Sequence, residues 1–365
     1  MKKQRIVVKI GSSSLTNDNG EIDQLKFNDH VDALAMLKNI GHEVIVVSSG
    51  AVAAGFARLG YPSRPVTIKG KQAAAAVGQS LLIQSYIERF SEHAVVPAQI
   101  LLTRLDFSNR ERYNNAFAAM SELLDRGIMP IINENDTVSV EELTFGDNDM
   151  LSALVSGFLH ADQLIILTDV NGIYTSNPRL DPDAVRLTHL DEITDELLSG
   201  TDELGSKVGT GGMRSKLLAA KTAHTLAVPV FIGTGYGPTK LLDILKGHGD
   251  GTYISSPFGS VINTKRQWIA LHSESTGRLY VDQGAETAIL HNGRSLLPAG
   301  VFKVQGSFEV GEVVEVYGVE GLIGKGEVTY SSDQLRDTLL KRVRQAERFE
   351  PMLEVIHRDR WVQVQ

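Results

Sequence analysis

The sequence lacks cysteine altogether, which excludes disulfide bonds, thiolate catalysis and zinc sites built on cysteine. It also lacks any apolar run long enough to span a membrane. The first eleven residues, MKKQRIVVKIG, place basic charge before an apolar run that is too short for a secretory signal. We therefore expect a cytoplasmic protein. The net charge of −8 argues against nucleic-acid binding by the whole chain, although an anionic ligand needs only local positive charge.

Basic residues are missing from one long stretch, because no Lys or Arg occurs between Gly127 and Pro178. Within it, PIINENDTVSVEELTFGDNDMLSALV (130–155) contains six acids and three asparagines. Turns and helix caps explain some of these side chains but not their density. A zwitterion site uses the same groups, since acids bind an ammonium while amides and a helix end bind a carboxylate. An acid beside Mg²⁺ or an active lysine is an equally good interpretation. The candidates are Asn133, Asn135, Asp136, Asn148 and Asp149.

The first two-thirds of the chain alternate short apolar runs with helical patterns. Continuously apolar runs are typical of strands covered on both faces, and the alternation predicts an α/β domain with an open, mainly parallel sheet sandwiched by helices. We place this domain at residues 1–260. The predicted strands are 5–10, 43–49, 95–102, 129–133, 163–169 and 228–233, and the predicted helices include 27–39, 71–90, 113–126, 149–160 and 214–226.

The pattern changes after DGTYISSP, which ends near residue 257. From Trp268 the chain is rich in glycine, with short strand-like runs such as GRLYVD, GEVVEVYG and GLIGKGEV. This pattern predicts a smaller β-rich domain at residues 274–352. A helix over residues 331–348 is expected to close that domain.

Ligands of open parallel sheets bind beyond the carboxyl ends of the strands, so the residues that follow each strand are the candidates for a site. Lys9 ends the first predicted strand and Gly11 with three serines follows it, whereas SSG with Ser49 follows the second. Capped turns explain either motif equally well. No GxxxxGK[ST] motif occurs, and GTGYG (233–237) follows the last strand of the domain, which disfavours a dinucleotide fingerprint.

A second glycine run, GSKVGTGGMRSKLLAAKTA, starts at Gly205 and leads into an amphipathic helix with Lys216 near its first turn. Backbone amides at a helix start form an anion site, and Lys216 adds a full positive charge. The alternative is a flexible loop before an ordinary helix. Two lysines on phosphate-type loops, together with the distant acid and amide cluster, favour phosphoryl transfer.

Several motifs occur in the order VVKIGSSSLT, VSSGAVAAG, AAVGQ, PIINENDTV, FGDND, LTDVNGIY and GTGGMRSK. Together they resemble the glutamate 5-kinases of the amino acid kinase superfamily, and the C-terminal domain resembles the PUA domain, an RNA-binding fold. The resemblance covers essentially the whole chain. It implies ATP-dependent phosphorylation of the side-chain carboxylate of L-glutamate to L-glutamyl 5-phosphate, the first step of proline biosynthesis, with ATP and Mg²⁺ as cofactors.

The resemblance also assigns roles to individual residues. Lys9 and Lys216 contact and neutralise the transferring phosphoryl group, and Asp149 orients these two lysines. Arg214 and Ser215 stand where related enzymes vary, and we attach no functional change to them. No protein side chain is assigned as a metal ligand. Glutamate binding is assigned to Ser49, Asp136 and Asn148, and nucleotide binding to Lys9, Thr168, Asp169, Thr210, Gly211, Gly212, Met213, Arg214, Ser215 and Lys216.

Elementary chemistry agrees with this assignment. A glutamate side chain has a pKa of about 4.3, so it is an ionised nucleophile at neutral pH and requires no general base. The obstacle is repulsion between this carboxylate and a triphosphate, because like unit charges about 4 Å apart repel by about 4 kcal/mol at an effective dielectric constant of about 20. Two lysines and Mg²⁺ offset that repulsion.

The resemblance further implies inhibition by L-proline, a homo-oligomer, and transfer of the acyl phosphate to glutamate-5-semialdehyde dehydrogenase. Glu142 and its neighbours in the loop 139–146 are candidates for closing over glutamate or proline, because that loop has few apolar anchors.

Two alternatives stay open: a related kinase acting on aspartate, carbamate or a nucleoside monophosphate, and an RNA-binding protein. Residues 274–365 hold 14 acids against 11 Lys and Arg, so this region shows no strong electrostatic signature for RNA. The helix LRDTLLKRVRQAER is locally basic, as a solvated helix face can be.

Overall fold

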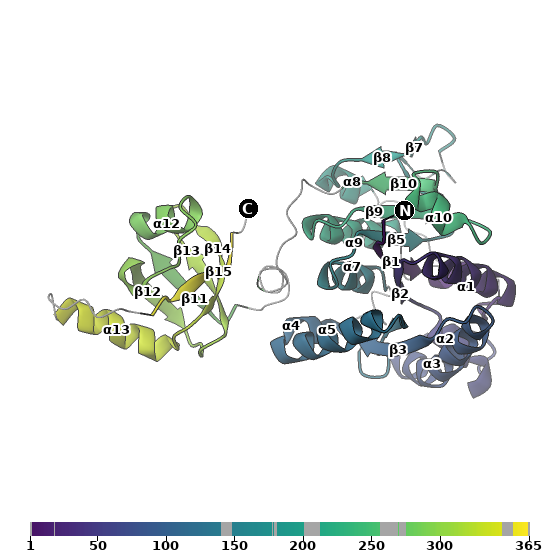
Figure 1. The fold of residues 1–365 in the computed structure, drawn as a ribbon, viewed down its shortest axis with the longest axis horizontal. Helices are drawn as coiled ribbons and strands as arrows, with labels where there is room; N and C mark the ends of the chain where they lie inside the picture. Colours follow the sequence, from purple (N-terminus) through teal and green to yellow (C-terminus); the bar gives the residue numbers. More distant parts are fainter. Residues whose placement is uncertain are drawn as a thin grey trace. The chain divides into compact units, whose positions relative to one another are not determined.

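The computed structural model describes residues 2–17, 19–139, 148–176, 178, 181–200, 212–255, 269, 275–344 and 353–363. The chain divides into two compact units: residues 1–104 and 114–261 form the first, and residues 105–113 and 262–365 form the second. No helix in these described ranges combines the length and the apolar character needed to cross a membrane. Each unit is built around its own sheet (Figure 1).

The first unit contains an eight-stranded sheet in the order β3-β4-β2-β1-β5-β9-β10-β8. All neighbouring strands are parallel except the pair β9 and β10. The prediction of a mainly parallel sheet is therefore confirmed, and all six predicted strands are present with ends shifted by two residues or fewer. The strands are β1 (Arg5–Ile10), β2 (Glu43–Val47), β3 (Pro97–Leu102), β4 (Met129–Glu134), β5 (Gln163–Leu167), β8 (His189–Leu190), β9 (Val230–Thr234) and β10 (Asp250–Ile254).

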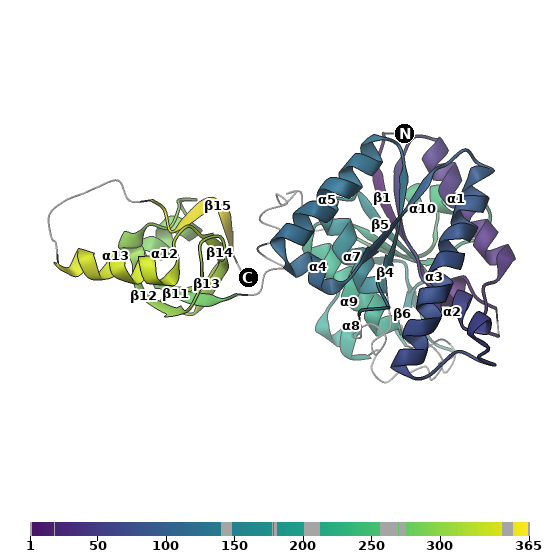
Figure 2. The same cartoon turned by 90° about the horizontal axis from the view of Figure 1, so that it is seen from below.

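Helices cover both faces of this sheet (Figures 1 and 2). On one face lie α1 (Gln24–Asn39), α3 (Ile68–Ser91) and α10 (Lys240–Leu245), and on the other α7 (Asn148–Phe158) and α9 (Met213–Thr225). Phe117 of α5 (Arg110–Asp125) meets Phe158 of α7 edge-on, with ring centroids 5.5 Å apart. Shorter elements are η1 (Ser12–Ser14), α2 (Ala51–Gly55), η2 (Ala57–Leu59), α4 (Arg104–Ser108), the hairpin β6 (Ile173–Tyr174) and β7 (Arg186–Leu187), and α8 (Asp195–Gly200).

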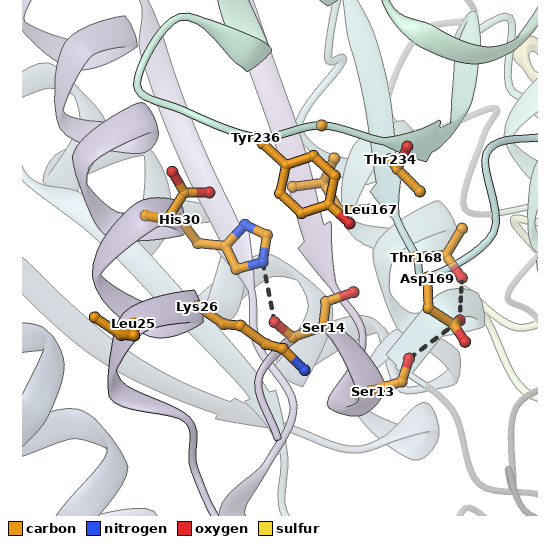
Figure 3. Close-up of a pocket in the computed structure, with 12 residues that line it drawn as sticks. Ser13, Ser14, Leu25, Lys26, His30, Leu167, Thr168, Asp169, Thr234 and Tyr236 are labelled. Atoms are coloured by element: carbon orange, nitrogen blue, oxygen red, sulfur yellow. Dashed lines mark hydrogen bonds between the residues drawn. The ribbon is translucent and has the colours of Figure 1, made fainter. Parts of the chain in front are cut away.

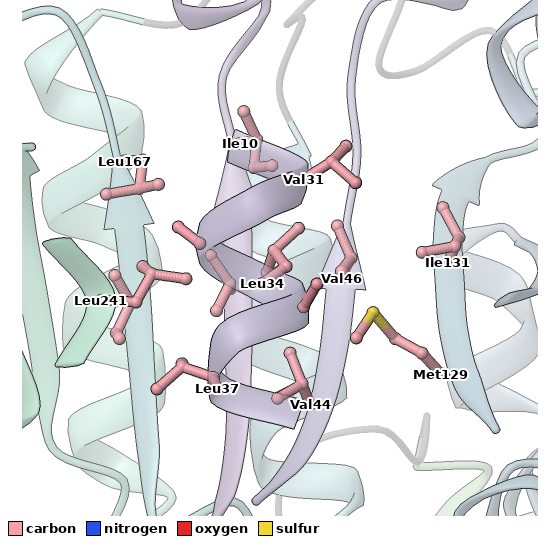
Figure 4. Packing of buried hydrophobic residues seen from close by; sticks show 14 of the residues in the cluster. Ile10, Val31, Leu34, Leu37, Val44, Val46, Met129, Ile131, Leu167 and Leu241 are labelled. Atoms are coloured by element: carbon pink, nitrogen blue, oxygen red, sulfur yellow. The ribbon is translucent and has the colours of Figure 1, made fainter. Parts of the chain in front are cut away.

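The main core lies between the sheet and α1 (Figure 4). Val31, Leu34 and Leu37 of α1 are fully buried against strand residues such as Ile10 and Val46. The carboxylate of Asp23 accepts hydrogen bonds from the amides of the first helical turn, which sets the start of α1. Because apolar strand residues are covered from both sides, the strands are continuously apolar rather than alternating. This packing holds the carboxyl ends of the strands in fixed positions.

Two glycines allow α2 to pack closely against α3. A Cβ atom on Gly78 would lie 1.8 Å from the carbonyl oxygen of Ala51, and one on Gly55 would lie 2.0 Å from that of Ala74. No side chain fits at either position, so the helices meet backbone to backbone. This contact fixes the loop after β2, which includes Ser49.

The second unit has a five-stranded sheet in the order β12-β11-β13-β14-β15, with β11 and β13 parallel and the other neighbours antiparallel. Its β-rich character is confirmed. The expectation that a helix closes this unit is wrong, because β15 follows α13 and pairs with β14. The proposed limit at residue 352 leaves this strand out. The elements are β11 (Gly277–Val281), α12 (Gln283–Leu290), η4 (Pro298–Gly300), β12 (Val301–Gly306), β13 (Val313–Tyr317), β14 (Leu322–Val328), α13 (Ser332–Arg344) and β15 (Ile356–Gln363).

Candidate active site

Three charged side chains from distant parts of the sequence meet at the carboxyl end of the first unit's sheet. Lys9 is at the end of β1, Asp149 is in the first turn of α7, and Lys216 is in the first turn of α9. Nζ of Lys9 lies 2.5 Å from Oδ1 of Asp149, and Nζ of Lys216 lies 3.1 Å from Oδ2. The structure therefore brings together all three residues predicted to be catalytic.

These three side chains are buried, with exposed fractions of 0% for Lys9, 0% for Asp149 and 6% for Lys216. Together they carry a formal charge of +1. Removing ions from water is costly unless partners and hydrogen bonds compensate, so a buried group of this kind favours an anionic ligand. The Ser215 hydroxyl donates a hydrogen bond to Oδ2 of Asp149 at 2.9 Å, the oxygen that also accepts from Lys216. An aspartate that pairs with two lysines and accepts from a serine is suited to orienting cations.

Gly11 borders the space beside Lys9. Its amide donates to the carbonyl of Leu167 on β5 at 3.3 Å, which joins the β1 loop to the end of the neighbouring strand. A Cβ atom at this position would lie 3.5 Å from Nζ of Lys9 and would narrow the approach to the ammonium. Glycine therefore leaves room for a ligand atom to reach Lys9.

The start of α9 supplies a second feature suited to an anion. Gly212 is its N-cap residue and has no side chain to occupy the amides of the first turn, which includes Met213, Arg214 and Ser215. The Ser215 amide donates to the carbonyl of Gly212 at 3.1 Å, and the positive end of the helix dipole lies at this terminus beside Lys216. Of the residues predicted for the nucleotide, Thr210 and Gly211 lie outside the described residues.

A hydrogen-bonded cluster of amides and hydroxyls adjoins Asp149. The Asn148 side-chain amide donates to the carbonyl of Ser48 at 2.7 Å, to Oδ1 of Asn133 at 2.8 Å and to Oγ of Ser49 at 3.2 Å. It thus ties the start of α7 to the ends of β2 and β4. Oδ1 of Asn148 is buried and has no hydrogen-bond partner in the described part of the chain, which leaves it as an acceptor for a ligand.

Two supporting residues were not among the predicted site residues. Gln79 on α3 accepts a hydrogen bond from Asn133 at 2.7 Å, and the Tyr86 hydroxyl lies 2.9 Å from that of Ser48. Both hold the residues that contact Asn148. The family motif AAVGQ ends at Gln79 and could have identified that residue. Tyr86 has no such motif, because its sequence context is that of an ordinary core aromatic residue.

Asp136 stands apart from this cluster, because no hydrogen bond joins it to Ser49 or Asn148 among the described residues. Burial raises the pKa of its carboxyl to about 6, and the positive charge of Arg64 opposes that rise. The fold therefore makes this acid titrate near neutral pH, where a bound cation would favour its ionised form. Glu142 and most of the loop 139–146 lie outside the described residues.

Thr168 and Asp169 follow β5, as expected for a strand-end site. The Thr168 amide donates to the carbonyl of Gly233 on β9 at 2.9 Å. The hydroxyls of Thr168 and Ser13 donate to Asp169 at 3.2 and 3.3 Å (Figure 3). Thr168 and Asp169 border a cavity of about 320 Å³ on the α1 side of the sheet.

The described residues contain no group of three or more His, Asp or Glu side chains arranged to hold a metal ion. Mg²⁺ often keeps several waters and binds through substrate phosphates in enzymes that use nucleotides.

Comparison with known proteins connects this geometry to a family. Residues 4–234 match the model of the amino acid kinase family, and residues 277–349 match that of the PUA domain. The protein named Glutamate 5-kinase 1 of Bacillus licheniformis is 65% identical over 364 residues, and that of Bacillus subtilis is 62% identical, each alignment covering 100% of both chains. Glutamate 5-kinase of Oceanobacillus iheyensis is 58% identical, over 100% of this chain and 98% of that protein.

One solved structure shows the same fold at low identity. The carbamate kinase of Giardia lamblia bound to AMP-PNP superposes with a TM-score of 0.50 at 16% identity, over 70% of this chain and 99% of that one.

Proposed function

The chain belongs to the amino acid kinase family and within it to the glutamate 5-kinases, and we propose that it transfers the γ-phosphoryl group of ATP to the side-chain carboxylate of L-glutamate. The product is L-glutamyl 5-phosphate, and the reaction is the first step towards proline. The observation that carries the proposal is the buried group of Lys9, Asp149 and Lys216. It concentrates positive charge where a strand end and two helix starts converge.

The chemistry requires charge neutralisation more than proton transfer. One oxygen of the ionised glutamate carboxylate attacks the γ-phosphorus, a new P–O bond forms, and the bond to the β,γ-bridging oxygen breaks to release ADP. Lys9 and Lys216 reduce repulsion between the two anions and stabilise the charge on the transferring group. Asp149 holds both ammonium groups in place through the contacts described above.

Mg²⁺ is the expected companion of the triphosphate, and it supplies further neutralisation of phosphate charge when bound. No protein ligand for it is proposed. The chain's own contribution on the donor side is the start of α9, the loop at Gly11 beside Lys9, and the residues Thr168 and Asp169.

Glutamate recognition is proposed for the cluster around Asn148. Oδ1 of Asn148 and the hydroxyl of Ser49 offer hydrogen bonds to the amino acid, and ionised Asp136 attracts its ammonium group. L-Proline keeps an α-carboxylate and a cationic nitrogen but folds its side chain into a ring. We therefore propose that proline inhibits by occupying part of the same site.

Assembly into a homo-oligomer and transfer of the acyl phosphate to glutamate-5-semialdehyde dehydrogenase remain predictions from the resemblance. For the second unit we propose a role in assembly or regulation rather than in chemistry, and RNA binding by it is unproven.

The deciding experiment measures ADP release by the full chain with Mg²⁺, ATP and one acceptor at a time: glutamate, aspartate, carbamate or UMP. We expect glutamate-dependent release, and trapping of the product with hydroxylamine should yield the glutamyl hydroxamate. Release that depends on another acceptor and not on glutamate would replace the proposal with a different kinase activity.

A further inference from the structure

A cavity of about 320 Å³ lies on the α1 side of the first unit's sheet, and its walls are mostly residues with no role in the proposed reaction (Figure 3). Lys26, Asp29 and His30 of α1 form one wall, and Thr234 at the end of β9 forms another with Tyr236, which follows the strand. Its volume is within the range of small-molecule sites, which starts at about 300 Å³.

The cavity is lined by α1, whereas the segment predicted to hold ATP continues into α9, which covers the opposite face of the sheet (Figure 1). The two places share only Thr168 and Asp169, which lie between them at the end of β5. A molecule bound against α1 therefore need not displace a nucleotide that lies against the start of α9.

The charges of the lining favour a neutral occupant. Asp29 is already engaged, because it pairs with Lys240 of α10 and accepts from the amide of Gly237. The Lys26 ammonium donates to the carbonyl of Thr16 at 2.7 Å. Asp29 is neutralised by its ion pair, and the two remaining charges of the lining, positive on Lys26 and negative on Asp169, cancel. The lining therefore has no excess charge to attract an ion.

The imidazole of His30 is neutral at neutral pH, because burial and the nearby charge of Lys240 lower its pKa to about 4. Its Nε2 lies 3.1 Å from the carbonyl oxygen of Ser14 and therefore carries the ring proton, so that Nδ1 is an acceptor. Nδ1 and the Ser14 hydroxyl are buried, and neither has a hydrogen-bond partner in the described part of the chain. The wall thus contains polar groups that the fold itself leaves unsatisfied.

The shape of the lining favours a flat ring. Tyr236 is 87% exposed and presents its ring at the cavity beside His30 (Figure 3). An aromatic face of this kind is a stacking surface for any heterocycle. Hydroxyl groups, which are partners for the hydroxyls of a sugar, complete the rim; those outside the residues predicted for the nucleotide belong to Ser13 and Thr234.

We propose that this cavity is a second small-molecule site that takes a neutral nucleoside, with its base stacked on Tyr236 and its ribose at the hydroxyl-bearing rim. The site is distinct from that of the phosphoryl donor. Because η1 (Ser12–Ser14) follows Lys9 and contributes to the cavity, the occupant contacts the same loop as the proposed reaction site.

The test measures adenosine binding to the full chain by titration calorimetry, with Mg²⁺ and AMP-PNP present at saturating concentration. We expect one saturable adenosine site under these conditions. Tyr236→Ala should weaken it on the order of tenfold, since it removes the stacking surface. Phe302→Ala is the matched control, because Phe302 is also a strongly exposed aromatic, at 65%, but belongs to the second unit, and it should leave adenosine affinity unchanged.

His30→Phe is a second variant, which keeps a ring of similar size but removes the acceptor, and it should also weaken adenosine binding. Thermal unfolding checks whether the His30→Phe variant is folded. If that variant is not folded, the adenosine affinity of Tyr236→Ala alone decides whether the cavity is the binding site. Absence of saturable binding when AMP-PNP is bound, or equal adenosine affinity in wild type and Tyr236→Ala, overturns the proposal. Neither result affects glutamate-dependent ADP release, so the proposed reaction stands or falls separately.

Discussion

The two units differ in how their buried charges are balanced: two lysines share one carboxylate in the first, whereas the buried Glu327 of the second pairs with Arg360 at 2.7 Å. In the first, Lys9, Asp149 and Lys216 are buried at the end of a parallel sheet. In the second, the charges of β11 and β12 lie on the outer face of the sheet: Arg278 is 5.6 Å from the ring centre of Tyr317, and Lys303 is 4.8 Å from that of Tyr280.

This difference indicates which unit carries the chemistry. Exposed ion pairs contribute about 0–1 kcal/mol and cation–π contacts at exposed sites about 0.5–1 kcal/mol, so the second unit's surface charges stabilise it only slightly. Breaking a buried pair costs about 3–5 kcal/mol, because one ion is left without compensation in a poorly solvated place. The group in the first unit holds two lysines on one carboxylate, and this excess of positive charge suits an anion, which favours the first unit as the seat of phosphoryl transfer.

The largest effect should come from the buried lysines. Lys9→Ala and Lys216→Ala should each reduce kcat on the order of 100-fold or more, because each removes a charge that stabilises the transferring phosphoryl group. Steady-state kinetics at saturating ATP and glutamate measure the loss. A variant with near-normal kcat would show that the lysine it lacks has no catalytic role.

Lys240→Met is the matched control for these variants. Lys240 is also a buried lysine in an ion pair with an aspartate, but it joins α10 to α1 and lies outside the proposed reaction site. Its replacement should lower thermal stability and leave kcat largely intact. A comparable loss of kcat in this control would mean that replacing a buried lysine lowers activity by disturbing the fold. The losses in the Lys9 and Lys216 variants would then not demonstrate a catalytic role.

A smaller effect is expected from the amide cluster. Asn148→Ala removes the unsatisfied Oδ1 and three hydrogen bonds, so the KM for glutamate should rise about tenfold, while kcat changes less. The proline concentration that halves activity should shift together with this KM, because both ligands are proposed to use one site. Proline inhibition that competes only with ATP would contradict a shared site.

The pH dependence of glutamate binding should be smaller still. Burial raises the pKa of Asp136 to about 6, so its carboxylate gains a proton as the pH falls through that value and then no longer attracts an ammonium group. Between pH 6.5 and 5.5 the ionised fraction of such a group falls about threefold, and kcat/KM for glutamate should fall with it.

Asp136→Asn should have lower kcat/KM and should lose this part of the pH profile, while any contribution from ATP ionisation stays the same in both proteins. Superimposable profile shapes for the wild type and Asp136→Asn would assign the pH dependence to another group.

The smallest effect should follow from removing the second unit. A chain that ends near Ser260 should still bind ATP and phosphorylate glutamate at close to the full-length rate, since the groups proposed for the reaction all belong to the first unit and each unit has its own apolar core. Activity and oligomeric state are measured on the same preparation. A folded truncation that is inactive at every glutamate concentration would give the second unit a part in the chemistry.

Periodicity alone located six of the eight strands described in the first unit's sheet and its longer helices, because apolar runs bounded by glycine and polar residues depend on local sequence; it missed β8 and β10. It missed α12, and it missed β15, whose sequence IHRDRWVQ looks polar because most of the strand is only partly buried. Pairing with β14 makes it a strand, and that contact joins segments about 30 residues apart. The site residues of the first unit came from motifs, which identify residue types but not their contacts.

The sequence by itself determined the fold class of both units, the strand ends proposed to bind the ligands, and the family. Only the tertiary structure decided that Lys9 and Lys216 share the carboxylate of Asp149, that Asn148 ties three loops together, and that burial shifts the pKa of Asp136. The physical reason is that burial and ion pairing depend on how the crossover helices return the chain to the sheet. Residues 9, 149 and 216 become neighbours only when β1, α7 and α9 pack together.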